Sequence, residues 1–194
     1  MGSSSWKGGP VREISAQQIA ETVARLAQEA NYYLPEDVLD ALRAARARED
    51  APRAQKVLDV ILKNAEVAAQ GQIALCQDTG TTVIFLDVGQ DVHIQGELRQ
   101  ALADGVSKGY RGGFLRSSIV RHPFSRRLNT GDNTPPVVHT EIVPGDRLKI
   151  TLMPKGGGCE NMSRMAILKP GEGKKGIADF VLRTIEESGG NPCP

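Results

Sequence analysis

The sequence predicts an α+β fold in which an amino-terminal helical layer precedes a mixed, largely antiparallel sheet with packing helices. Apolar residues recur at helical spacing within residues 12–71, and β-branched apolar runs such as residues 82–88 follow. The composition, 40% hydrophobic and 24% charged over 194 residues, is typical of a folded globular chain that is large enough for a substantial core. We therefore expect one domain over residues 11–194, with its α+β part at 72–194.

Three helices are expected in the first third of the chain. Ser15 and Gln18 form a capping-box pattern, which predicts a helix over about residues 15–31 with the apolar residues Ile19, Val23, Leu26 and Ala30. Pro35 suits the first turn of a second helix. Pro52 opens a third helix, which Gly71 ends.

Two strand pairs and two helices are expected after this layer. Residues 82–88 and 92–94 predict a hairpin, and residues 137–143 and 148–153 predict an antiparallel pair around a Pro-Gly turn. Helical spacing returns at residues 97–110. A last helix is expected at residues 176–188, with its inward face formed by Ile177, Phe180, Val181, Leu182 and Ile185.

Charge and hydropathy argue against nucleic-acid and membrane partners. The formal net charge is only +1, so no global field attracts polyanions or an anionic membrane. The apolar runs are far shorter than the roughly 20 residues that a membrane-spanning helix needs. We expect no nucleic-acid partner and no membrane partner.

The termini and cysteines indicate a reducing compartment. Residues 1–10 are rich in Gly and Ser and contain no apolar signal segment, so we interpret them as an expression remnant. The three cysteines, Cys76, Cys159 and Cys193, are odd in number and widely spaced, which is atypical of a disulfide framework. We expect reduced thiols and a cytoplasmic location.

The densest polar cluster is residues 76–80, Cys-Gln-Asp-Thr-Gly, between a helix end and an apolar strand. It places the Cys76 thiol two residues from the Asp78 carboxylate. One interpretation is a structural turn in which Asp78 binds nearby backbone N–H groups and Cys76 is a small buried hydrophobe. The other is a chemical site, and spacing alone favours the turn.

Two further segments could bind an anion. Three glycines follow Lys155 and could present backbone N–H groups to an oxyanion, although a plain glycine turn explains them equally well. Residues 107–127 contain no acidic residue and carry Lys108, Arg111, Arg116, Arg121, Arg126 and Arg127. An Arg guanidinium group can bind a carboxylate or a phosphate through two parallel hydrogen bonds, so this stretch could bind an anion. The alternative interpretations of the stretch are a solvated basic face and an RNA-binding strip.

Cys193 lies between two prolines, as cysteines that bind iron–sulfur clusters sometimes do. A zinc site is poorly supported, because the chain has no Cys-x-x-Cys pair and its histidines, His93, His122 and His139, lack ligand spacing to any cysteine. The chain ends one residue after Cys193, which we interpret as truncation.

Four motifs in order resemble one enzyme family. Residues 76–80, 129–133, 155–158 and 191–194 resemble the alpha subunit, or amino-terminal domain, of iron–sulfur-dependent class I fumarate hydratases and their tartrate dehydratase relatives. The resemblance extends over nearly all of residues 12–194. Any one motif would be weak evidence, whereas four at matching intervals are specific.

The resemblance implies a 4Fe–4S cluster held by three cysteines, with Cys76 and Cys193 at two of these positions. The third belongs to a stretch that follows the Pro-Cys-Pro motif, so we expect an absent or incomplete cluster here. Cys159 occupies a position where relatives commonly have Ser, and we assign it no ligand role.

The resemblance also implies the reaction, the reversible hydration of fumarate to L-malate. Asp78 matches the acid/base carboxylate, while Gln77, Arg116 and the backbone of Gly158 match positions that bind the dicarboxylate substrate. The base that removes the carbon-bound proton belongs to a beta subunit, so we expect a hetero-oligomer of alpha and beta subunits and an inactive isolated chain. The alternatives are an L-tartrate dehydratase alpha subunit and a non-catalytic module that binds RNA or another anion.

Overall fold

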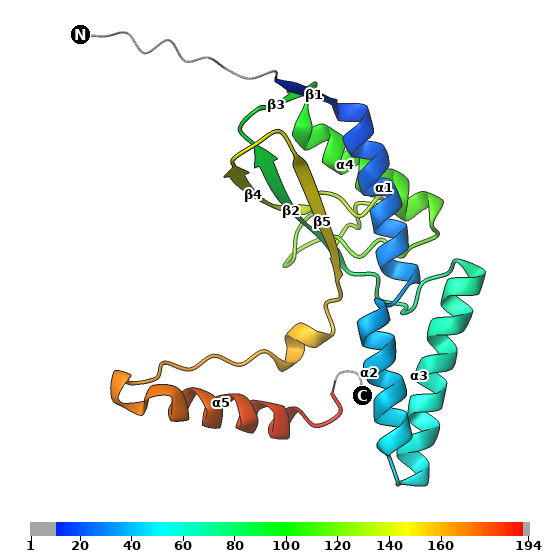
Figure 1. Ribbon diagram of the computed structural model, residues 1–194, viewed down its shortest axis with the longest axis vertical. Helices are drawn as coiled ribbons and strands as arrows, with labels where there is room; N and C mark the ends of the chain where they lie inside the picture. The colour runs from blue at the N-terminus through cyan, green and yellow to red at the C-terminus, as the bar shows by residue number, and fades with distance from the viewer. Residues whose placement is uncertain (1–10, 192–194) are drawn as a thin grey trace. The chain divides into compact units, whose positions relative to one another are not determined.

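The computed structural model describes residues 11–191, apart from the side chains of residues 159 and 160. Both the proposed expression remnant and Cys193 lie outside the described residues. The chain divides into a first unit that ends at Lys155 and a second unit that begins at Gly156 (Figure 1). Helices and mixed sheets confirm the α+β class. No helix among the described residues combines the length and apolar character needed to cross a membrane.

The expected amino-terminal helices are confirmed as α1 (Ala16–Tyr32), α2 (Glu36–Arg48) and α3 (Pro52–Gly71). The capping box is present: the Ser15 hydroxyl accepts a hydrogen bond from Gln18 N at 3.2 Å, and the Gln18 side chain accepts one from Ser15 N at 3.0 Å. A short strand, β1 (Arg12–Ser15), precedes α1 and was not expected.

Helices α2 and α3 pack on each other and are tied by one two-pronged ion pair. The Arg46 guanidinium donates to both carboxylate oxygens of Asp59, at 2.6 and 3.2 Å. This hydrogen bonding lowers the pKa of Asp59 below its ordinary value. Helix α2 buries none of its residues among the described part of the chain, so this helical pair contributes little to the main core.

The strand pairings differ from those expected. Strands β2 (Thr81–Gly89), β4 (Val137–Val143) and β5 (Leu148–Lys155) form one sheet in the order β4-β2-β5. The expected antiparallel pair β4–β5 is wrong, because β2 lies between these strands, parallel to β4 and antiparallel to β5. The expected hairpin is also wrong, because β3 (Val92–Gln95) pairs in parallel with β1. Parallel pairings therefore outnumber antiparallel ones among the described strands, although the sheet is mixed as expected.

Burial explains why β2 takes the central position. Its inner-face residues Ile84 and Leu86 are almost completely buried, which a central strand achieves and an edge strand does not. The connection from β4 to β5 crosses the end of β2, where Gly89 N donates to Arg147 O at 2.8 Å and Asp91 N to Gly145 O at 3.0 Å. A side chain at residue 89 would collide with the backbone of Gly145, so only glycine allows this crossing.

The main core lies between the inner face of this sheet and two helices, α1 and α4 (Leu98–Gly112). Helix α4 confirms the helix expected at residues 97–110 and packs closely along α1 (Figure 1). Two glycines on α4 allow this approach. A Cβ atom on Gly105 would lie 2.6 Å from the carbonyl oxygen of Ala20, and one on Gly109 would lie 2.7 Å from that of Ala24.

The second unit contains two short 3₁₀ helices, η1 (Cys159–Met162) and η2 (Pro170–Glu172), and helix α5 (Gly173–Ser188). The expected last helix is therefore confirmed, with an earlier start. The expectation that one face of α5 is buried is wrong within the described second unit, because no residue of this helix is buried. The unit is too small to cover an apolar helix face, so Ile177, Val181, Leu182 and Ile185 remain exposed.

Candidate functional site

The polar segment at residues 76–80 forms the loop that leads into β2. Its outer part is accessible and its inner part is fixed: Cys76 and Gln77 are exposed, Asp78 is half-buried, and Thr79 and Gly80 are buried. The burial of Thr79 and Gly80 gives a rigid base to the three residues that could do chemistry.

The Asp78 carboxylate forms the expected backbone turn. Its Oδ1 accepts a hydrogen bond from Gly80 N at 3.1 Å, and its own N–H donates to Cys76 Sγ at 3.4 Å. The structural prediction for Asp78 is therefore confirmed, whereas the prediction that Cys76 is a buried hydrophobe is wrong. The turn holds an accessible thiol and a carboxylate in one local structure.

Tyr110, on the last turns of α4, holds the loop at residues 76–80 in place by a hydrogen bond. Its hydroxyl donates to Thr79 O at 2.6 Å, and burial raises the pKa of this phenol, so it remains a donor over the physiological range. Thr79 Oγ1 in turn donates to the backbone carbonyl of Arg116 at 2.8 Å. This bond brings the segment that carries Arg116 against the cysteine loop.

Asn133 joins three segments of the site. Its side chain is fully buried, donates to Gly80 O at 3.0 Å and accepts from Ser118 N at 2.7 Å. Its φ of 60° lies in the left-handed region, which asparagine tolerates better than most residues. The sequence analysis gave Asn133 and Tyr110 no role. The only sequence signal that pointed to Asn133 was the motif at residues 129–133, and none pointed to Tyr110.

Asp132 and Asn129 shape the loop next to Asn133. Asp132 Oδ1 accepts from Thr134 N at 3.1 Å and from Thr134 Oγ1 at 2.8 Å. Burial by itself would raise the pKa of Asp132, but hydrogen bonding by Thr134 and Thr130 together with the charge of Arg111 outweighs burial and lowers the pKa below its ordinary value. Asn129 accepts from Gly131 N at 2.7 Å on the exposed side of the loop.

The structure thus brings together Cys76, Gln77, Asp78 and the backbone of Arg116, whose side chain is exposed. Lys155, the last residue of β5, lies opposite Thr81, the first residue of β2. Gly158 belongs to the second unit, and its role, like that of Cys193, stays a prediction.

Only part of a metal-ligand set lies in the described residues. No group of three or more His, Cys, Asp or Glu side chains is placed there to hold a metal ion. Cys76 is a free, exposed thiol whose Sγ accepts a hydrogen bond from Asp78 N, so its donor chemistry fits one ligand position of an iron–sulfur cluster.

The basic stretch at residues 107–127 divides into two parts, the end of α4 and the following loop. Its residues Arg111, Arg121, Arg126 and Arg127 are exposed. Two aromatic side chains are also almost fully exposed there, Phe114 at 97% and Phe124 at 98%. Arg116 differs from the other cations because its backbone is bonded to the cysteine loop.

Comparison with known proteins agrees with the resemblance inferred from the motifs. The sequence model of the family described as Fumarate hydratase (Fumerase) matches residues 20–194. The chain belongs to this family. The match includes all the candidate site residues on both units of this family member.

Similar proteins are named as tartrate dehydratase subunits. A Methanocaldococcus jannaschii protein named "Putative L(+)-tartrate dehydratase subunit alpha" is 38% identical over 184 residues, which are 91% of this chain and 64% of that protein. L(+)-tartrate dehydratase alpha subunits of Escherichia coli strains UTI89 and K12 are 30% and 29% identical over 187 residues, or 94% of this chain and 61% of theirs. This family member therefore spans less than two thirds of the length of these relatives.

We expect Asn133→Ala to lower the free energy of unfolding by about 2–4 kcal/mol. The substitution removes the donor that bonds the buried Gly80 O and the acceptor that bonds the half-buried Ser118 N, and it places Ala in the left-handed region. Urea unfolding followed by circular dichroism measures the change.

The control is Asn129→Ala. This side chain also bonds two backbone groups but is exposed, so water can replace it and the loss should stay below about 1 kcal/mol. Equal losses for the two variants would contradict the framework role of Asn133.

Proposed function

We propose that this chain is the alpha component of a hydro-lyase that acts on a four-carbon dicarboxylate, with fumarate and L-malate as its substrate pair. The observation that carries the proposal is the loop at residues 76–80. It presents a thiol, an amide and a carboxylate on a base that is hydrogen-bonded to the Arg116 segment. Membership of the Fumarate hydratase family supports the same reaction class.

In this proposal each residue of the loop has a separate task. Cys76 is one ligand of a 4Fe–4S cluster, which when bound supplies Lewis-acid polarisation of substrate oxygens. Asp78 gives a proton to the hydroxyl that leaves during dehydration, and takes one from water during hydration. Its bond to Gly80 N orients the carboxylate for this transfer.

Substrate carboxylates would be bound by the exposed side chains. Arg116 can form two parallel hydrogen bonds to a planar carboxylate, and Gln77 can donate through its amide. The backbone N–H of Gly158 is the third proposed contact. The base for the carbon-bound proton would come from a beta subunit, which the names of the alpha-subunit relatives imply for those proteins.

L(+)-tartrate is the second candidate substrate. The relatives named above favour it, because they are named as tartrate dehydratase alpha subunits. Both reactions break a C–O and a C–H bond of a hydroxy dicarboxylate and release water. The same thiol, carboxylate and Arg groups could therefore serve either substrate.

The test is an anaerobic assay of an alpha chain that contains this sequence and extends to the length of its relatives, reconstituted with iron, sulfide and a beta subunit. We expect turnover of fumarate and L-malate by the complex, with a lower kcat/KM for L(+)-tartrate, and none by the chain alone. A higher kcat/KM for tartrate would select the second candidate. A cluster-loaded complex inactive on both substrates would contradict the proposal, and salt-sensitive RNA binding by that inactive protein would favour the anion-binding alternative.

A further inference from the structure

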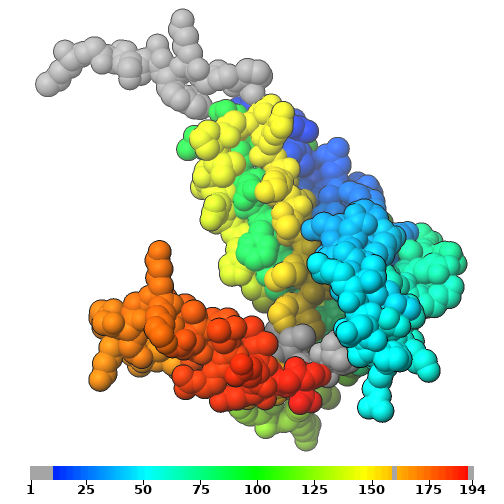
Figure 2. All heavy atoms as spheres, turned by 60° about the horizontal axis from the view of Figure 1, so that its bottom comes forward, coloured from blue at the N-terminus to red at the C-terminus, as the bar shows by residue number. Residues whose placement is uncertain are grey.

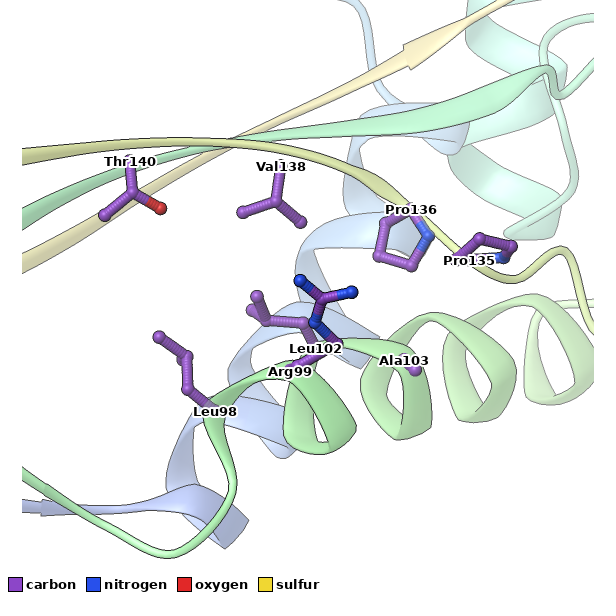
Figure 3. A pocket seen from close by; sticks show the side chains of 8 residues that line it. All are labelled: Leu98, Arg99, Leu102, Ala103, Pro135, Pro136, Val138 and Thr140. Carbon is purple, nitrogen blue, oxygen red and sulfur yellow. The ribbon is translucent and has the colours of Figure 1, made fainter.

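The candidate site lies on an open surface of the first unit. Cys76, Gln77 and Arg116 are exposed, although charged groups act more strongly on a substrate that is enclosed. The apolar groove between α4 and β4 does not provide that enclosure (Figure 3). Arg99 is the one charged residue in its lining, which includes none of the residues assigned to the substrate. We therefore expect a second protein surface to cover the site.

Phe114 has an unusual conformation two residues before Arg116. Helix α4 ends in a Schellman turn, in which Leu115 N donates to Tyr110 O at 2.9 Å. Phe114 N donates to Arg111 O at 3.4 Å in the same turn. The residue at this point of a Schellman turn is left-handed and is usually glycine, whereas here it is Phe114, with φ of 53°. A bulky side chain is strained in this region.

The turn directs the Phe114 ring into solvent. Phe114 is 97% exposed, while the next residue, Leu115, is buried in the main core. Glycine at residue 114 would remove both the strain and the exposed ring. Strained residues of this kind cluster at functional sites. The combination of strain and exposure therefore indicates a binding role for the Phe114 side chain.

The chain around Phe114 is basic. Residues 107–127 contain no acidic residue. Within the part of the chain that the structure describes, no ion pair involves four exposed guanidinium groups of this stretch, those of Arg116, Arg121, Arg126 and Arg127. Figure 2 shows part of the stretch, in yellow-green, at the surface near the lower edge of the view. Phe and Arg are both enriched in protein interfaces, so this surface fits an apolar pocket with an acidic rim.

We propose that Phe114 anchors this chain to the beta subunit, by inserting its ring into an apolar pocket of that subunit with an acidic rim. The inference rests on the proposed function, in which the beta subunit provides the base for the carbon-bound proton. That base must come within hydrogen-bond reach of a substrate bound to Arg116. Phe114 is two residues from Arg116, a span of at most about 7 Å between Cα atoms. The subunit that brings the base therefore comes within contact distance of the ring.

Phe114→Gly tests the anchor, because it removes the ring and also relieves the backbone strain. The alpha chain extended to the length of its relatives is titrated with the beta subunit, without oxygen, in an isothermal titration calorimeter. We expect Phe114→Gly to raise the Kd about tenfold or more, as for other aromatic anchors. The melting temperature of the alpha chain should not fall, since glycine adopts the left-handed region freely. Phe114→Asn, which also tolerates this region, should behave in the same way.

Phe124→Gly is the matched control. Phe124 is 98% exposed and belongs to the same basic stretch, but its φ is not positive and it lies farther from Arg116 along the chain. Its substitution should change the Kd less than about threefold. Added salt should raise the Kd of the unchanged chain, because salt screens pairs between Arg and acidic side chains. Equal weakening by Phe114→Gly and Phe124→Gly would contradict the proposal, as would a Kd that salt does not raise.

Affinity and turnover together separate this inference from the proposed function. A complex that depends on Phe114 but is inactive on fumarate, L-malate and L(+)-tartrate would contradict only the proposed function. An active complex whose Kd is unchanged by Phe114→Gly would contradict only the anchor, even if the KM for the substrate rises. Weaker self-association with unchanged binding of the beta subunit would also contradict the anchor. A lack of binding between the two unchanged chains would contradict both.

Discussion

Asp78→Asn should reduce turnover by the complete alpha–beta enzyme by about 10²–10⁴-fold, the usual range for loss of a general acid or base. Asparagine keeps the size of the side chain and an oxygen that can accept from Gly80 N, so the turn should persist. Only proton transfer is lost. Steady-state rates with L-malate and fumarate, measured without oxygen, give the change in kcat and in kcat/KM.

Asp132→Asn is the matched control for this experiment. Asp132 is also half-buried and also accepts from a backbone N–H two residues ahead, but it lies outside the proposed proton path. Its substitution should change kcat less than about threefold. Because Cys76 is two residues from Asp78, cluster absorbance must be recorded in the same samples. Near-normal turnover of Asp78→Asn, with a lower melting temperature, would leave Asp78 with only its structural role.

Gly105→Ala should lower the free energy of unfolding by about 2–4 kcal/mol, a large effect for one added methyl group. In a free helix the same change would stabilise by up to about 1 kcal/mol. Here the new Cβ would lie 2.6 Å from Ala20 O and 2.7 Å from Val23 Cβ, so α1 and α4 must separate in the centre of the core. Urea unfolding followed by circular dichroism measures this loss.

Gly112→Ala provides the control on the same helix. Its nearest neighbour would be the end of the flexible Gln28 side chain, at 3.2 Å, which can move aside. We expect the free energy of unfolding to change by less than about 0.5 kcal/mol. Similar losses for both variants would contradict the contact between α1 and α4 as the cause, and similar gains would show that helix propensity dominates.

The sequence alone determined the features that depend on near neighbours. The Ser15–Gln18 capping box predicted the start of α1, and Pro52 predicted the start of α3. These signals act through hydrogen bonds and backbone angles within a few residues, so no tertiary information is needed to interpret them. The four ordered motifs predicted the family in the same way, because each is a local string of residues.

The candidate site could be predicted only in part. Spacing singled out Cys76 and Asp78, because a thiol and a carboxylate lie two residues apart in a loop. No local sequence pattern linked them to Tyr110 or Asn133. These two residues hold the loop by hydrogen bonds to Gly80, although they lie 30 and 53 positions from it along the chain. A hydrogen bond over such a distance along the chain has no signature in the sequence pattern.

Only the tertiary structure decided how the strands pair. The sequence favoured pairs between neighbouring strands, because short turns join them. The structure instead places β2 between β4 and β5, and pairs β3 with β1. The reason is burial: Ile84 and Leu86 can be fully covered by α1 and α4 only in a central strand, and Gly89 lets the chain cross over its end. That advantage depends on helices far away in the chain, so it exists only once the core has formed.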